Sequence, residues 1–283
     1  MISYSIITPV KNEVLNIATT IESVVNQSML PVEWVIIDDN SNDGSEIILT
    51  KAAEKYSWIK LIKPEEYKID DYSSRVVHLF NYGLKKIGKP VDFISKLDGD
   101  VSFNSNFYSN ILKQFQNNPK LGIASGYLTI KNIPEKNQNT NYICTRGATK
   151  VYRLNCLNDI GGIICFQGWD TLDNVAARAL SWEVAILPEY FEHLKEEGSK
   201  VGNKYYSQYR TGVYNGAVPY LWGYFLLKAI SKTFNTPFFI GALLQIAGYI
   251  NGRFFSKLHP YPEFIVNRLH FEQRETLKSL FKL

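Results

Sequence analysis

The sequence VDFISKLDGD, residues 91–100, ends an apolar run with two carboxylates. The run from Val91 to Leu97 predicts a buried strand. Asp98 and Asp100 then lie together at the mouth of this strand, where two carboxylates repel each other unless a positive group binds between them. A divalent cation that carries a diphosphate fits this position, because hard cations bind oxygen ligands and bridge phosphates to protein. A tight Asp-Gly turn is the alternative interpretation.

A second acidic strand end lies upstream, where residues 33–37 are followed by Asp38 and Asp39. Two acidic strand ends support a ligand site more strongly than one does. A carboxylate at such a position can accept a hydrogen bond from a base N–H or a ribose hydroxyl. Capping of the following turn is the alternative role for Asp38 and Asp39.

Strand-like and helix-like segments alternate over residues 4–115. This alternation predicts an α/β fold with a mostly parallel sheet flanked by helices, in a Rossmann-like arrangement. Ligands of such sheets bind beyond the carboxyl ends of the strands. We therefore expect one site to be shared by Thr8, Asp38, Asp39, Asp98 and Asp100.

Composition and charge argue against several classes of function. The chain has 283 residues, 45% hydrophobic and 20% charged, which fits a globular protein. Its net charge of +4 comes without a dense stripe of Lys and Arg, so nucleic acid is not an expected partner. Cys144, Cys156 and Cys165 lack a zinc-binding spacing and are expected to be reduced thiols. The N-terminus leads into an apolar strand without a signal segment, which predicts a cytoplasmic protein.

Three segments, in their order and spacing, resemble family 2 glycosyltransferases of the GT-A fold. They are IITPVKNE at residues 6–13, IDDNS at residues 37–41 and LDGD at residues 97–100. The resemblance spans about residues 3–195. It implies an inverting, metal-dependent enzyme that moves a sugar from a nucleoside diphosphate-sugar donor to a hydroxyl acceptor, in the assembly of surface glycans.

The resemblance also implies where the nucleotide binds. Pro9, Asn12 and Glu13 are expected beside it, with Thr8 at the end of the same strand, and Asp39 is expected to recognise the base. For Glu13, a charge that stabilises a helix N-terminus is the alternative interpretation.

The same resemblance places the diphosphate and its cation. Asp98 is expected to approach the ribose and Asp100 to hold Mg²⁺ or Mn²⁺, which would neutralise the leaving group. Arg75, on the helix before the Asp98 strand, could hold phosphate oxygens, or it could be a solvated helix charge. His193 precedes Leu194 and Lys195, where relatives often have a His before basic residues, and could complete the metal site; a structural role is the alternative.

The segment GWDTLD, residues 168–173, resembles the part of the family that carries the general base. By position that base is Asp170, which would remove the proton of the acceptor hydroxyl as its oxygen attacks the anomeric carbon. Asp173 is the competing candidate. A structural alternative is that Asp170 only caps the helix that follows.

The C-terminal region is more apolar. Residues 218–227 and 237–250 are apolar runs, shorter than the roughly 18–20 residues that cross a bilayer, and basic residues flank them: Lys228, Lys232, Arg253 and Lys257. They resemble the tail of a subset of these transferases and suit a membrane interface. Burial against the catalytic domain or in a dimer is the alternative.

We therefore expect a GT-A catalytic domain at residues 1–204 and a helical, apolar C-terminal region at residues 205–283. The nucleotide-binding part would span about residues 1–120 and the acceptor part about residues 121–204. The enzyme would lie at the inner face of the cell membrane. Its acceptor would be a glycan or a lipid-linked molecule. A homo-oligomer is also possible.

Two other functions use similar features. A sugar nucleotidyltransferase also has an α/β sheet and metal-binding carboxylates, but usually a Gly-rich phosphate loop, whereas residues 8–13 contain no glycine. A non-catalytic nucleotide-binding or membrane-docking partner is the third hypothesis, and the retained acidic residues argue against it.

Overall fold

The structure is a computed structural model. It describes residues 2–69, 71–130, 133–134, 142–195, 204–231, 239–255 and 260–281. Part of the segment expected near a membrane interface lies outside these ranges: Lys232, Lys257 and the start of the second apolar run.

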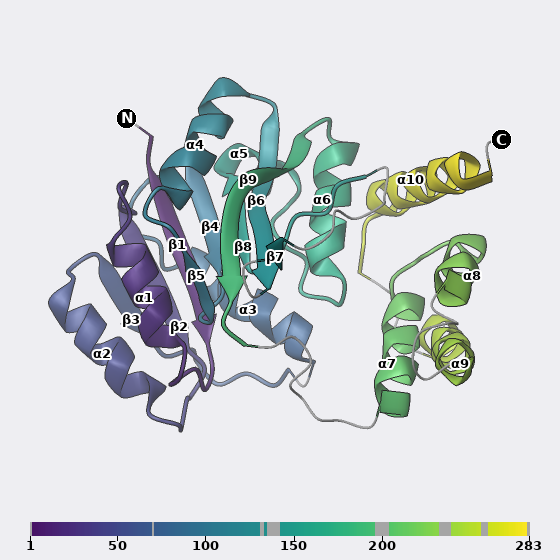
Figure 1. Ribbon diagram of the computed structural model, residues 1–283, viewed down its shortest axis with the longest axis horizontal. Helices are drawn as coiled ribbons and strands as arrows, with labels where there is room; N and C mark the ends of the chain where they lie inside the picture. The colour runs from purple at the N-terminus through teal and green to yellow at the C-terminus, as the bar shows by residue number, and fades with distance from the viewer. Residues whose placement is uncertain are drawn as a thin grey trace.

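Parallel strands form the N-terminal half of the sheet, in the order β3-β2-β1-β4 (Figure 1). The strands and their connecting helices are β1 (Tyr4–Val10), α1 (Ile17–Val25), β2 (Glu33–Asp38), α2 (Ser45–Lys55), β3 (Ile59–Ile62), α3 (Tyr72–Leu84) and β4 (Phe93–Leu97). The alternation predicted from the sequence is confirmed here, because each parallel pair needs a crossover connection.

The rest of the sheet is mixed, so the prediction of a mostly parallel sheet is wrong. The elements are β5 (Val101–Phe103), α4 (Phe107–Asn117), β6 (Leu121–Ile130), β7 (Ile133–Pro134), β8 (Thr149–Arg153), α5 (Leu154–Asp159), α6 (Trp169–Ala179) and β9 (Glu183–His193). The strand order continues β4-β8-β6-β9-β5, and β8 runs antiparallel to both β4 and β6. Antiparallel neighbours need no crossover helix, so they leave no alternation in the sequence.

Helices cover both faces of the sheet. One apolar cluster includes Ile6 of β1 with residues of α1, α2 and α4, and the other includes Ile7 with residues of α3, α5 and α6. Successive strand residues point to opposite faces, which explains why neighbouring isoleucines belong to different clusters.

The C-terminal region forms helices within the described ranges: α7 (Lys204–Ala217), α8 (Trp222–Ser231), α9 (Ile240–Phe254) and α10 (Glu263–Phe281). Figure 1 shows α10 beside α6. Ile265 and Leu269 of α10 belong to the second apolar cluster. Glu272 accepts two hydrogen bonds of 2.7 Å from Arg178 of α6. The division at residues 1–204 and 205–283 remains a prediction, but α10 packs directly on the sheet domain.

Helices α7 and α9 pack with their backbones in contact. A Cβ atom at Gly212 or Gly216 would overlap backbone atoms of α9, and one at Gly248 or Gly252 would overlap backbone atoms of α7. Only glycine permits this distance between two helix axes. Helices α7 and α9 therefore form one closely packed pair, although α8 lies between them in the chain.

Candidate active site

Two carboxylates and a histidine meet at the carboxyl end of β4. Asp98 and Asp100 lie in the short turn between β4 and β5. Strand β5 pairs with β9 so that Val101 lies opposite His193. One ligand atom from each of Asp98, Asp100 and His193 lies within 4.8 Å of the other two. We call these three residues the metal group.

The metal group fits a divalent cation. The Nδ1 atom of His193 is buried and has no hydrogen-bond partner among the described residues. It lies 3.6 Å from a carboxylate oxygen of Asp100. Two carboxylates and an imidazole nitrogen are donors that Mn²⁺ accepts, and Mg²⁺ takes the oxygens. The geometry thus favours a ligand role for His193 over a purely structural one.

The carboxyl group of Asp100 is less easily ionised than an ordinary aspartate, because it is buried beside Asp98. Burial of its carboxyl group, followed by the charge of Asp98, raises its pKa to about 6. His193 and Lys195 act in the opposite direction, and Glu13 adds to the rise. A cation bound between the carboxylates would relieve this repulsion, because opposite charge favours the ionised form.

A cavity of about 340 Å³ extends from the metal group to the start of α6, and we call it the reaction cavity. Asp98 and His193 line one part of it, and Asp170 lines another. Lys96 and Trp169 lie on its wall as well. The structure therefore brings Asp98, His193 and Asp170 to a single cavity, while Asp100 lies next to it in the metal group.

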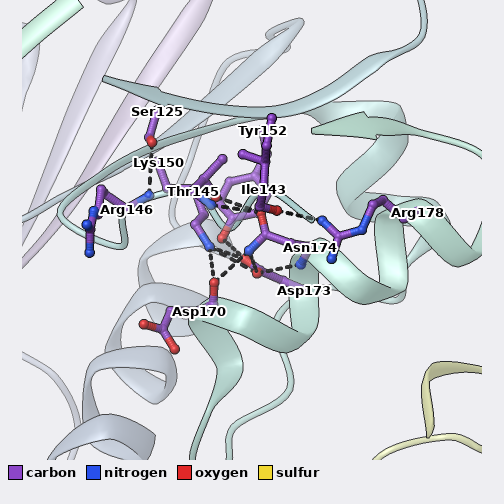
Figure 2. Close-up of polar contacts among 10 residues, drawn as sticks. All are labelled: Ser125, Ile143, Thr145, Arg146, Lys150, Tyr152, Asp170, Asp173, Asn174 and Arg178. Atoms are coloured by element: carbon purple, nitrogen blue, oxygen red, sulfur yellow. Dashed lines mark hydrogen bonds and ion pairs between the residues drawn. The ribbon is translucent and has the colours of Figure 1, made fainter. Parts of the chain in front are cut away.

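The first turn of α6 presents Asp170 to this cavity. Gly168 adopts φ +78° at the N-cap, a conformation that favours glycine, and no side chain caps the helix. Lys150 donates a hydrogen bond of 2.7 Å to the backbone oxygen of Asp170. Figure 2 shows the Asp170 carboxylate pointing away from the polar network around Lys150. Capping by the side chain, the structural alternative, is therefore not its role.

Asp173 lies in a different environment. Its carboxylate is buried and accepts hydrogen bonds from Lys150, at 2.9 Å to each oxygen, and from Tyr152 (Figure 2). The backbone and side chain of Asn174 donate to it too. These partners occupy the carboxylate, which makes Asp170 the better base candidate.

Asp39 lies at a second cavity, of about 370 Å³, beyond the end of β2. Tyr67 donates its hydroxyl to one carboxylate oxygen of Asp39, and Lys11 Nζ lies 3.2 Å from the other. An Arg75 nitrogen is 3.9 Å from that same oxygen. Arg75 and Asp39 thus lie together, with the Tyr67 side chain beside them.

The remaining residues of the first motif do not line either of these cavities. The Thr8 hydroxyl accepts a hydrogen bond of 2.9 Å from Trp34 in the core, so its side chain does not face a cavity. Pro9 is part of β1. Asn12 accepts a hydrogen bond of 2.9 Å from the Asn42 backbone. Glu13 forms an ion pair with Lys195, near the metal group.

Asp38 does not join the expected site either. Its carboxylate is buried and accepts a hydrogen bond of 3.0 Å from the Ser41 backbone, so it caps the turn after β2. Successive strand residues point in opposite directions, and Asp39 is the one of the pair that reaches a cavity.

Sequence reasoning missed three residues of the site: Lys96, Trp169 and Tyr67. A lysine inside an apolar strand was the available signal for Lys96, because a buried ammonium needs an anionic partner. Tyr67 gave no signal, since it lies in an irregular segment and meets Asp39 only through the fold.

Comparisons with known proteins agree with this architecture. Residues 5–168 match the sequence model of Glycosyl transferase family 2. The minor teichoic acid biosynthesis protein GgaA of Bacillus subtilis (strain 168) is 30% identical over 169 residues, 58% of this chain and 36% of GgaA. The chain thus spans about a third of the length of this curated relative.

Two solved structures share the fold. Mannosyltransferase PcManGT from Pyrobaculum calidifontis, in complex with GDP-Man and Mn²⁺, has a TM-score of 0.58 at 14% identity, over 99% of this chain and 87% of that chain. S. aureus TarS 1–349, in complex with UDP-GlcNAc, has a TM-score of 0.57 at 19% identity, over 91% of this chain and 74% of that chain. At these identities the similarity shows the fold alone.

Proposed function

Because the chain belongs to glycosyl transferase family 2, and is therefore a glycosyltransferase, we propose that it is an inverting, metal-dependent enzyme that uses a nucleoside diphosphate-sugar donor. The observation that carries this proposal is the single cavity that joins Asp98 and His193 to Asp170. One end of it offers cation ligands, and the other offers the Asp170 carboxylate, which points away from the polar network around Lys150.

The donor would bind across the two cavities. Asp39 and Arg75 would hold the base and a phosphate in the second cavity, and Asp98, Asp100 and His193 would hold Mg²⁺ or Mn²⁺. Neutralisation of the leaving diphosphate is the chemistry that such a cation supplies. Pro9, Asn12 and Glu13 would shape the nucleotide site through their backbone and through the turn that they stabilise. Thr8 would support the strand end from the core.

Asp170 would act as the general base. Its carboxylate takes the proton of the acceptor hydroxyl while the acceptor oxygen forms a bond to the anomeric carbon. The bond from that carbon to the diphosphate oxygen breaks in the same step, and the nucleoside diphosphate leaves with the bonding electrons. Attack opposite the leaving group inverts the anomeric configuration.

The acceptor would be a hydroxyl of a surface glycan, either a growing polymer or a lipid-linked one. A relative involved in minor teichoic acid biosynthesis supports this class of product. The sugar and the base are not specified by these residues, since relatives of the same fold were crystallised with GDP-Man and with UDP-GlcNAc.

We also propose that the C-terminal region docks on the inner face of the cell membrane. Trp222, Leu226 and Ile230 of α8 are exposed and recur every four residues, on one face of the helix. Phe254 and Phe255 are 65% and 82% exposed, beside Arg253. No helix of the described residues is long and apolar enough to cross a membrane. Co-sedimentation with phosphatidylglycerol vesicles is expected, and its absence would contradict this docking.

A binding panel tests the donor proposal. Thermal unfolding would be followed with UDP-GlcNAc, UDP-glucose and GDP-mannose, each with Mn²⁺ or with EDTA. One nucleotide-sugar is expected to stabilise the protein only with Mn²⁺, because a ligand that binds the folded state alone adds stability in proportion to the logarithm of its concentration over Kd. A protein that responds to none of them, or equally with EDTA, contradicts a metal-dependent transferase.

A further inference from the structure

Lys96 is a buried lysine at the wall of the reaction cavity. It is the penultimate residue of strand β4, and its side chain is 3% exposed. Burial of an ammonium group is unfavourable unless partners compensate it. Its ion-pair partner is Asp98, and its Nζ lies 5.3 Å from the centre of the Trp169 ring. Packing alone therefore does not explain why a lysine occupies this position.

Lys150 provides an internal comparison. It lies opposite Lys96 in the β4–β8 pair, is equally buried, and faces the same Trp169 ring at 5.3 Å. A lysine has three N–H donors. Lys150 directs its donors at both oxygens of Asp173 and at the Asp170 backbone oxygen. Its hydrogen-bonding capacity is filled by the protein.

Lys96 has N–H donors that the described residues do not use. Among the described residues its hydrogen-bond partner is one oxygen of Asp98, and its side chain lines the reaction cavity, which Lys150 does not. Up to two N–H donors are thus available to an oxygen-rich ligand in that cavity. In a buried site such charge-assisted hydrogen bonds are strong.

We propose that Lys96 binds the sugar of the donor through hydroxyl oxygens. This inference rests on the proposed function. Its position supports the sugar as the ligand, because Lys96 lies between Asp98, at the metal group, and Trp169, directly before Asp170. The reacting carbon must lie in that interval, between the metal-bound diphosphate and the base.

The sign of the electrostatic effect distinguishes this role from a metal-supporting one. Removal of the Lys96 charge leaves the metal group more negative, which favours a bound cation. The affinity for a nucleoside diphosphate with Mn²⁺ should therefore stay the same or rise. The affinity for the intact nucleotide-sugar should fall, because the hydroxyl contacts are lost.

The test is calorimetric titration of the wild type and of Lys96→Met, with Mn²⁺. Each nucleotide-sugar is compared with its own diphosphate: UDP-GlcNAc and UDP-glucose with UDP, and GDP-mannose with GDP. In the pair that binds the wild type, the affinity for the nucleotide-sugar is expected to fall about tenfold or more, and the affinity for the diphosphate is not expected to fall. Lys113→Met, on the exposed face of α4, should change neither value. Lys96→Gln, a shorter neutral donor, replaces Lys96→Met if that variant does not fold.

The other outcomes contradict the inference. Equal losses for the diphosphate and the nucleotide-sugar would assign Lys96 to the diphosphate or the metal group, and no loss in either would leave it a structural residue. If the wild type binds none of these nucleotide-sugars with Mn²⁺, the proposed function itself fails, and the role of Lys96 fails with it. If the wild type binds a nucleotide-sugar and the Lys96 variants bind it equally well, the Lys96 proposal is contradicted and the proposed function is not.

Discussion

Asp170→Asn is expected to reduce sugar transfer about 100- to 10,000-fold, the range that a general base contributes. The amide has nearly the same shape as the carboxylate but cannot accept the acceptor proton. Nucleotide binding should not change, because the backbone oxygen of Asp170 still accepts from Lys150 and the metal group is untouched. Initial rates with saturating donor, together with calorimetric Kd values, measure both quantities.

Asp173→Asn is the matched comparison, since it makes the same change three residues along the helix. It removes the charge that compensates the buried Lys150, so it should lower the free energy of unfolding by about 3 kcal/mol. Asp170→Asn should change that free energy little, because its carboxylate points away from the network. Full turnover by Asp170→Asn would refute the base assignment, and a stable, inactive Asp173→Asn would transfer the role to Asp173.

Asp100→Asn is expected to abolish Mn²⁺-dependent nucleotide binding and to reduce transfer at least about 100-fold, because a metal ion contributes several kcal/mol to stabilising the developing charge. Without metal the variant should be as stable as the wild type or more so, since it removes repulsion from Asp98. Asp92→Asn, at the opposite end of the β4 strand and bonded to Ser3, is the control and should keep Mn²⁺ binding. Undiminished Mn²⁺ binding by Asp100→Asn would remove Asp100 from the metal site.

The pH dependence of the wild type gives a second readout of the same group. The pKa of Asp100 is raised to about 6, first by burial and then by Asp98. A cation binds the ionised carboxylate, so its affinity should be highest well above pH 6 and should fall as protons occupy the group. Below pH 6 the fall should reach roughly tenfold per pH unit for one proton displaced. A constant affinity from pH 5 to pH 8 would contradict this assignment.

The sequence predicts the parallel half of the sheet well because each strand there is followed by a helix. The spacing of apolar residues therefore changes between the strand pattern and the helix pattern along the chain. The antiparallel strands β8 and β6 leave no such trace. Strand alternation also explains why the side chains of Thr8 and Asp38 are buried while Asp39 reaches a cavity, a difference that a list of strand ends does not predict. Which of two neighbouring residues faces a cavity depends on the twist of the sheet and on what packs behind it.

Asp170 and Asp173 show the limit most clearly. Both are acidic and lie on the same helix three residues apart, so no pattern along the chain distinguishes them. Lys150 and Tyr152, from a strand about 20 residues upstream, select Asp173 as the buried partner and leave Asp170 open. Likewise, the pairing of β5 with β9 brings His193 to Asp100, a contact of two segments more than 90 residues apart.

Anomalous diffraction from crystals grown with Mn²⁺ and the nucleotide-sugar that binds tests most directly whether these acidic residues serve one reaction. The strongest manganese peak should lie between Asp98, Asp100 and His193, with the sugar in the reaction cavity and its anomeric carbon facing Asp170. A manganese ion bound away from these three residues, or a sugar turned away from Asp170, would contradict the account.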